Sequence, residues 1–392
     1  NVKLTVNLRN VGSLPADSVS VTLSSDSPFI TFVEGTANYL SIGPDSIYGL
    51  PDGFEILLNK NVPDMEPILI NIQSVCQDTL IWNSSFQLIA HAPLLELEII
   101  SVLDPEGNNN GKLDVGETAQ VTIQIKNNGS SDICNAVANL NSVYELLEIE
   151  EGIFNYDTIA ANTSKIGIWN ITVSPNANTA DFANFSFNII EDEEIFLEEN
   201  FYLVIGQIPV LVLDLDNNQN SGTAIHSAIS TLGIQAVYST TFPTDLNIYK
   251  SIFVCLGTSP QNHELTLTEG VRLANYLNNG NYLYMEGADT WYEDQATAVH
   301  PLFNIQGVSD GGNDISTING QISRFTEGMV FGYSGENAYI DRINAVAPAF
   351  SIFKNQYPLY TCAVAYNQGT YKTIGSSFEF GGLVNNEFPS TK

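Results

Sequence analysis

Val121-Thr-Ile-Gln-Ile-Lys-Asn-Asn-Gly129 repeats the earlier segment Leu4-Thr-Val-Asn-Leu-Arg-Asn-Val-Gly12 at a separation of 117 residues. The same separation aligns Glu34-Gly-Thr-Ala-Asn-Tyr39 with Glu151-Gly-Ile-Phe-Asn-Tyr156. Two patches that keep one register over this distance indicate an internal duplication. In each copy apolar and polar residues alternate, and turns rich in Gly, Asn and Asp separate short runs. This pattern is typical of the strands of a β-sandwich.

The duplication divides the first half of the chain into two domains. Residues 1–93 and residues 94–207 are each expected to form an immunoglobulin-like β-sandwich. Pro93 and Pro209 mark the ends of the two copies. A chain of 392 residues has room for about two to four domains, so a further domain is expected after Pro209.

The pattern changes after Pro209. Residues 210–216 are a continuous apolar run that ends in acids, which indicates a strand buried on both faces of a parallel sheet. Residues 222–233 and about 266–277 have helical spacing and alternate with further apolar runs. Residues 208–392 are therefore expected to form an α/β flavodoxin-like domain, incomplete at its C-terminus.

In an open doubly wound sheet, ligands bind beyond the carboxyl ends of the strands. The candidate ligand-binding residues at these ends are Asp214, Asp216, Glu286, Asp289 and Trp291. The alternative for Asp214 and Asp216 is capping of the following helix, and the sequence favours it. Trp291 is most simply a core or rim aromatic residue, although Trp291 and Tyr292 beside Asp289 would suit a carbohydrate.

The charge excludes some classes of partner. Asp and Glu number 44 against 13 Lys and Arg, and the net charge is −31. Such a chain is repelled by nucleic acid and by anionic membranes. Hydrophobic residues make up 44% of the chain, which is too much for disorder. No apolar run is long enough for a transmembrane segment, and the four scattered cysteines predict buried thiols rather than a disulfide framework.

A calcium loop is predicted at the start of the second copy, in Asp104-Pro-Glu-Gly-Asn-Asn-Asn-Gly-Lys-Leu-Asp-Val-Gly-Glu117. Counted from Glu106, oxygen side chains stand at positions 1, 3, 5, 9 and 12, and Gly111 at position 6 permits a sharp turn. Asp104 can replace Glu106 as a ligand. The expected ligands of a structural Ca²⁺ are Asp104, Glu106, Asn108, Asn110, Lys112, Asp114 and Glu117. The alternative is an acidic surface turn without a metal.

The two copies resemble the immunoglobulin-like modules that follow the catalytic domain in secreted gingipain-like and subtilisin-like peptidases of Bacteroidota. Residues 121–129, 82–93 and 110–117 carry the resemblance. It implies a secreted, extracellular, surface-attached protein, exported by type IX secretion.

Four short motifs are similar to the Asp-Ser/Thr-aliphatic sites at which Bacteroidota add O-linked glycans to exported proteins. The candidate acceptor hydroxyls are Ser18, Ser46, Thr79 and Thr158. The alternative is that each motif is only a turn.

The last part of the chain resembles the class I glutamine-amidotransferase-like family. Leu273–Gly287 and Ser376–Leu383 carry this resemblance. Active members need a nucleophile just after the fourth strand and a His after a late strand. Here residues 286–290 contain no Cys, and no His follows His300. These departures argue against amidotransferase or peptidase activity.

A different catalytic pair is conceivable from Cys255 with His226 or His263. Cys255 lies inside an apolar strand, so a buried structural thiol is the preferred interpretation. The expected function is a non-catalytic structural or binding segment whose partner is a protein or carbohydrate at the cell surface. Two alternatives remain: the accessory C-terminal region of a secreted peptidase whose catalytic domain precedes residue 1, and a self-associating subunit of a surface filament.

Overall fold

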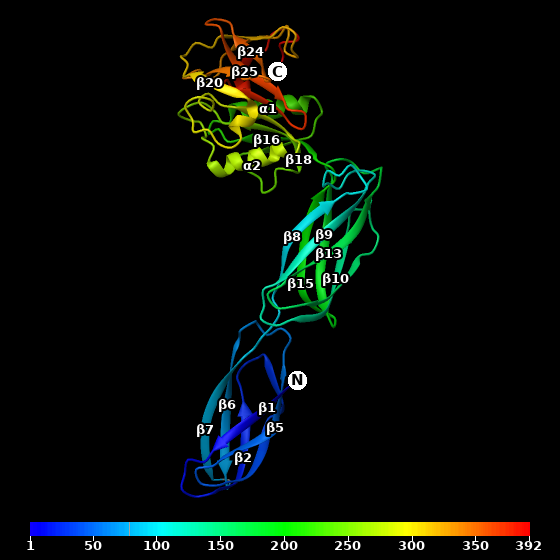
Figure 1. Ribbon diagram of the computed structural model, residues 1–392, viewed down its shortest axis with the longest axis vertical. Helices are drawn as coiled ribbons and strands as arrows, with labels where there is room; N and C mark the ends of the chain where they lie inside the picture. Colours follow the sequence, from blue (N-terminus) through cyan, green and yellow to red (C-terminus); the bar gives the residue numbers. More distant parts are fainter. Residues whose placement is uncertain (78) are drawn as a thin grey trace. The chain divides into compact units, whose positions relative to one another are not determined.

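The computed structural model describes residues 1–77 and 79–392 (Figure 1). Among these residues 50% lie in strands and 8% in helices. No helix within this described part is long and apolar enough to cross a membrane. The chain forms two compact units. The first comprises Asn1–Gly111, Glu117–Thr172 and Ala183–Tyr202, and the second comprises Lys112–Gly116, Val173–Phe182 and Leu203–Lys392.

The first copy consists of antiparallel strands in two sheets. Its strands are β1 (Val2–Arg9), β2 (Ala16–Ser24), β3 (Ile30–Glu34), β4 (Thr36–Ile42), β5 (Ile47–Leu58), β6 (Pro67–Cys76) and β7 (Leu80–Ile89). The sheet orders are β1-β5-β3 and β4-β2-β6-β7. Phe54 from the first sheet and Val21, Tyr39 and Ile70 from the second share one buried core, an arrangement compatible with a β-sandwich.

The second copy has the same plan. Its strands are β8 (Leu95–Leu103), β9 (Thr118–Asn127), β10 (Ile133–Ser142), β11 (Leu147–Ile149), β12 (Ile153–Ile159), β13 (Ser164–Val173), β14 (Phe182–Glu191) and β15 (Glu194–Val204). They form the sheets β12-β10-β14-β15 and β11-β13-β9-β8. Trp169 of one sheet meets Phe187 of the other with ring centroids 5.9 Å apart, so aromatic packing joins the sheets.

The duplication extends to single hydrogen bonds. The Tyr39 hydroxyl donates to the Val6 carbonyl at 2.7 Å, and the Tyr156 hydroxyl donates to the Ile123 carbonyl at 3.0 Å. Each of these residues is displaced from its counterpart by the same 117 positions.

A second pair of bonds repeats in the same way. Asn10 Nδ2 donates to the Ile42 carbonyl at 2.9 Å, and Asn127 Nδ2 donates to the Ile159 carbonyl at 3.1 Å. The two copies therefore share tertiary hydrogen bonds as well as sequence.

The rest of the chain contributes one 12-stranded mixed sheet. Its elements are β16 (Ile208–Asp214), α1 (Asn220–Thr231), β17 (Ala236–Ser239), β18 (Tyr249–Cys255), α2 (Leu267–Asn278), β19 (Tyr282–Glu286), η1 (His300–Phe303), β20 (Ile305–Ser309), β21 (Thr317–Gly320), β22 (Val330–Tyr333), β23 (Arg342–Ala345), β24 (Phe350–Asn355), β25 (Tyr360–Asn367), β26 (Lys372–Ser376), η2 (Phe380–Gly382) and β27 (Leu383–Val384). Strands β17-β16-β18-β19-β26 are parallel neighbours, and from β25 onward the pairing is antiparallel.

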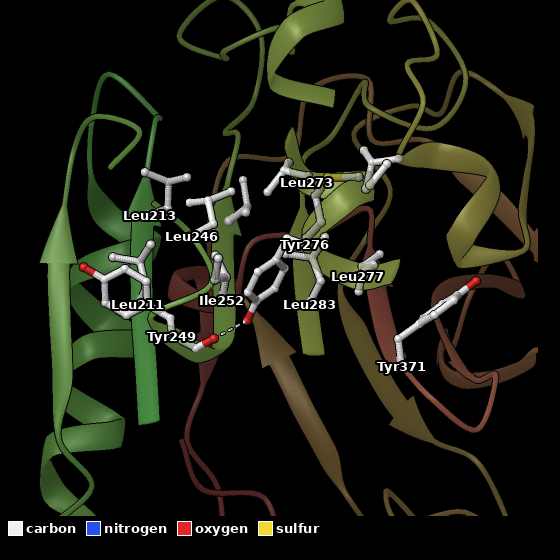
Figure 2. Packing of buried hydrophobic residues seen from close by; sticks show 14 of the residues in the cluster. Leu211, Leu213, Leu246, Tyr249, Ile252, Leu273, Tyr276, Leu277, Leu283 and Tyr371 are labelled. Carbon is white, nitrogen blue, oxygen red and sulfur yellow. Dashed lines mark hydrogen bonds between the residues drawn. The ribbon is translucent and has the colours of Figure 1, made fainter. Parts of the chain in front are cut away.

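Each face of the parallel strands is covered by one helix. Leu211 and Leu213 of β16 share a core with α2, while Val210 and Val212 share another with α1. Figure 2 shows the α2 side, where the Tyr276 hydroxyl donates to the Tyr249 carbonyl at 3.2 Å. Because β16 is buried on both faces, its apolar run is continuous.

The predicted α/β flavodoxin-like, class I glutamine-amidotransferase-like fold is wrong. The described residues hold only two α-helices, whereas a doubly wound fold needs a helix for each crossover between parallel strands. The connection from β19 to β26 is made of strands β20 to β25 instead. The alternation of apolar runs and helical spacing in residues 210–286 does not continue into the strands β20 to β25, which pair as antiparallel neighbours.

Candidate functional site

The carboxyl ends of the parallel strands bring polar side chains into one row. Asp214 pairs with Cys255, Cys255 with Glu286, and Glu286 with Ser376, across β16, β18, β19 and β26. Since parallel strands all end at the same edge, residues distant in sequence become neighbours there. Asp214 and Glu286 are both buried at this edge, with 1% and 0% exposure.

Next to this row lies a group of three carboxylates, Asp216, Glu336 and Glu379. One ligand oxygen from each lies within 4.8 Å of the others. Asp216 follows β16, Glu336 lies between β22 and β23, and Glu379 lies between β26 and η2. We call these three residues the acidic triad.

Two members of the acidic triad are buried and short of donors. Asp216 and Glu379 are 1% and 3% exposed. Asp216 Oδ2, Glu379 Oε1 and Asp214 Oδ1 are buried without a donor from a neighbouring residue. The Asp216 and Glu379 carboxyls are close enough to share a hydrogen bond when one of them is protonated. A buried carboxylate oxygen without a donor is costly unless it is protonated or contacts a cation.

The environment raises the pKa values of these acids. Burial, then the charges of Glu286, Asp216 and Glu336, raise the pKa of Glu379 to about 9. Burial raises the pKa of Glu286 to about 7, and it also raises the pKa values of Asp214 and Asp216. The site therefore concentrates more negative charge than it can hold without protons or a cation.

Neighbouring groups hold the flanking acids in place. The Tyr238 hydroxyl donates to Asp214 Oδ2 at 2.7 Å. Glu286 Oε2 accepts from the Tyr284 hydroxyl at 2.5 Å and from the Phe380 backbone N–H at 2.8 Å. Tyr284 and Phe380 also line an apolar cavity of about 370 Å³, so one wall of the site has a low dielectric.

Two glycines give the acids room. A Cβ at Gly257, where φ is +82°, would lie 2.4 Å from Asp216 Oδ1. A Cβ at Gly222, in the first turn of α1, would lie 2.2 Å from Asp214 Oδ2. The carboxylates thus lie directly against backbone, and larger residues at either position would displace them.

The other two candidate ligand-binding residues, Asp289 and Trp291, have partners outside the acidic triad. Asp289 Oδ2 accepts from the Ser259 N–H at 3.3 Å, and after burial the charges that raise its pKa are those of Asp310, Glu293 and Glu264.

Trp291 is a packing residue. Its indole N–H donates to the Ser376 carbonyl at 2.9 Å, and its ring packs on Phe303 with centroids 5.1 Å apart. The ring is therefore engaged in the core instead of forming an open platform.

The cysteine–histidine pairing is not assembled. Cys255 is fully buried and burial raises the pKa of its thiol well above the ordinary value, which keeps it protonated. His226 Nε2 lies 3.3 Å from the Ala236 carbonyl oxygen, and His263 Nε2 lies 3.1 Å from Glu269 Oε2.

In the loop 104–117, Asp104 lies inside and Glu106 is exposed. Asp104 Oδ1 accepts from the Gly111 N–H at 2.7 Å and Oδ2 from the Asn110 N–H at 3.0 Å. Glu117 Oε1 accepts from Asn108 Nδ2 at 3.2 Å, while Glu117 Oε2 is buried without a partner.

The four candidate glycan acceptors are all exposed: Ser18, Ser46, Thr79 and Thr158. Asp78, which opens the third motif, lies outside the described residues.

Sequence reasoning missed Glu336 and Glu379. Glu379 lies in the segment 376–383, which carries the resemblance to the amidotransferase-like family, and an acid there was a usable signal. Glu336 lies in a Gly/Asn-rich loop and had no local signal.

No family model and no curated protein matches the chain. Among solved structures, it is similar to an exo-β-1,4-mannosidase from Opitutaceae bacterium strain TAV5, with a TM-score of 0.33, 9% identity and coverage of 43% of this chain. The chain spans about a third of that enzyme, 31%.

It is also similar to a protein named as ThuA-like from Parabacteroides merdae, with a TM-score of 0.32, 10% identity and coverage of 44% of this chain and 79% of the other. Similarity to a transglutaminase from red sea bream has a TM-score of 0.21 and 12% identity, over 52% of this chain and 28% of that one. TM-scores this low carry no argument about function.

Proposed function

We propose that this chain is a non-catalytic extracellular or cell-surface segment with a structural or binding role, in which the loop 104–117 holds a structural calcium ion. The observation that carries the calcium assignment is Glu117 Oε2, a buried carboxylate oxygen without a hydrogen-bond donor. Bidentate chelation by the last Glu of such a loop would satisfy that oxygen.

The donor set of the loop fits a hard cation. Asp104, Asn108, Asn110, Asp114 and Glu117 offer oxygen atoms, as does the backbone carbonyl of Lys112. Asp104 replaces the exposed Glu106 in this set, because its carboxylate already organises the turn through two backbone N–H groups. Bound calcium would neutralise the loop and hold its backbone in one conformation.

The remainder of the proposal is supported by composition and by exposed side chains. A net charge of −31 suits solubility outside the cell and excludes anionic partners. The exposed hydroxyls of Ser18, Ser46, Thr79 and Thr158 are accessible to glycosylation, and type IX secretion would be the export route. The partner would be a surface protein or carbohydrate.

Two alternatives belong to the same proposal. The chain would be the accessory region of a secreted peptidase if its parent protein carries a catalytic domain before residue 1. It would be a filament subunit if the purified chain self-associates. Activity assays of the parent protein and sedimentation of this chain distinguish them from a monomeric scaffold.

The calcium assignment is tested by calorimetric titration of chelator-stripped protein with CaCl₂, with thermal melts recorded in chelator and in calcium. Glu117→Gln should remove one site and its share of the calcium-dependent rise in Tm, since a ligand of the native state stabilises by mass action. Glu145→Gln, an exposed acid in the same copy, is the charge-matched control. If wild type, Glu117→Gln and Glu145→Gln bind calcium equally, the assignment is contradicted.

A further inference from the structure

We propose that Asp216, Glu336 and Glu379 bind a hard divalent cation at the carboxyl edge of the parallel strands, independently of the loop 104–117. The three side chains come from segments far apart in sequence, and their ligand oxygens lie within 4.8 Å of one another. One ion at the centre of this group would contact all three carboxylates.

The orphaned oxygens are a separate observation that points to a ligand. Asp216 and Glu379 are more than nine-tenths buried, and one oxygen of each has no donor. The other oxygen of Asp216, Oδ1, accepts from the Asn218 N–H at 3.3 Å, so it is Oδ2 of this residue that lacks a donor. In the described part of the chain no residue outside the acidic triad donates to Asp216 Oδ2 or Glu379 Oε1.

The charge of the acidic triad is not balanced by a basic side chain. None of the ion pairs in residues 1–77 and 79–392 includes Asp216, Glu336 or Glu379. Lys392 Nζ donates to the Gly381 carbonyl at 3.0 Å instead of to the triad. Asp214 and Glu286 add further negative charge at the same edge, which favours a dication over a monovalent ion.

The donor atoms select the class of metal. All three side chains offer carboxylate oxygen, which suits Ca²⁺, Mg²⁺ or Mn²⁺ and not the softer metals. The neighbouring Cys255 thiol keeps its proton and is not a ligand. Three carboxylates leave coordination positions for water or for an oxygen-bearing ligand.

Access to the acidic triad is through Glu336. It is the least buried member, and its Oε2 accepts from Asn218 Nδ2 at 2.7 Å. A cation can therefore reach the buried pair without unfolding of the sheet.

The test uses the full chain carrying Glu117→Gln, so that the loop site does not contribute. Chelator-stripped protein is titrated separately with CaCl₂, MgCl₂ and MnCl₂ at pH 8. One site is expected for at least one of these cations. Adding Glu379→Gln or Glu336→Gln should weaken its affinity by at least about 100-fold, since loss of a ligand exceeds the effect of an outer-shell change. Glu387→Gln, an exposed acid, is the control and should change nothing.

Folding of the variants is checked by thermal melts in chelator. Glu379→Gln replaces the buried carboxyl by a neutral amide of similar size, so we expect its Tm in chelator to match or exceed that of the parent and to be indifferent to the cation. Glu336→Gln is less buried and retains an acceptor for Asn218, so it covers the case in which Glu379→Gln does not fold. Absence of binding by the Glu117→Gln protein, or equal binding by the triad variants, would show that protons alone occupy the cluster and would overturn the proposal.

Discussion

At the scale of single residues, the raised pKa of Glu379 links the stability of the fold to pH. The charges of Glu286, Asp216 and Glu336 act on its carboxyl, while its backbone N–H donates to the Tyr333 hydroxyl at 3.4 Å. A carboxyl whose pKa is higher in the folded state than its ordinary value of 4.5 binds its proton more tightly after folding. Its contribution to stability is fully present below pH 4.5 and is lost as the pH rises through about 9.

We therefore expect the Tm of chelator-stripped protein to fall between pH 5 and pH 9, and to fall less in Glu379→Gln. Burial raises the pKa values of Glu286 and Asp341 as well, to about 7 and about 8, so the difference between wild type and variant isolates Glu379. Thermal melts of both proteins at a series of pH values and constant ionic strength measure how Tm changes with pH. Parallel curves for the two proteins would show that Glu379 does not titrate as described.

At the scale of elements, the turns after the parallel strands position the acids. Gly257, just beyond β18, adopts φ +82° and lies against Asp216. Gly233, just beyond α1, has a similar φ of +71°, but a Cβ there would meet nothing within 4 Å. Both glycines need a left-handed backbone conformation, which disfavours any other residue. Only Gly257 also lies against a side chain, that of Asp216.

Gly233→Ala should cost about 1 kcal/mol, from left-handed backbone strain alone. Gly257→Ala adds displacement of Asp216 and should cost about 3 kcal/mol. It should also weaken the cation site by at least tenfold, since Asp216 is a ligand. Urea unfolding and calorimetric titration measure the two effects. If both substitutions have equal costs and leave cation binding intact, Asp216 is not held against Gly257.

At the scale of the whole molecule, the chain consists of two compact units with separate cores. The first unit holds most of the duplicated strands, and the acidic triad belongs to the second unit. A charge of −31 adds self-repulsion that a bound dication reduces locally.

We expect two transitions in differential scanning calorimetry of the chelator-stripped chain, because the cores can melt independently. Glu379→Gln should move only one of them. Added cation should move the same transition in the Glu117→Gln background. A single transition that shifts as a whole in both experiments would contradict this expectation.

The alternating strands of the duplicated copies could be predicted from sequence because one buried face leaves a local period of two residues. The places of Asp214, Asp216 and Glu286 at strand ends could also be predicted, since a strand buried on both faces is a continuous apolar run that ends where polar residues begin. A late strand at about residues 359–366 could be predicted and corresponds to β25, whereas β20 to β24 were missed because each is short and lies in a Gly/Asn-rich region without a clear period. Only the tertiary structure decided that Glu336 and Glu379 meet Asp216, because that proximity depends on strand order and on loops without a local pattern.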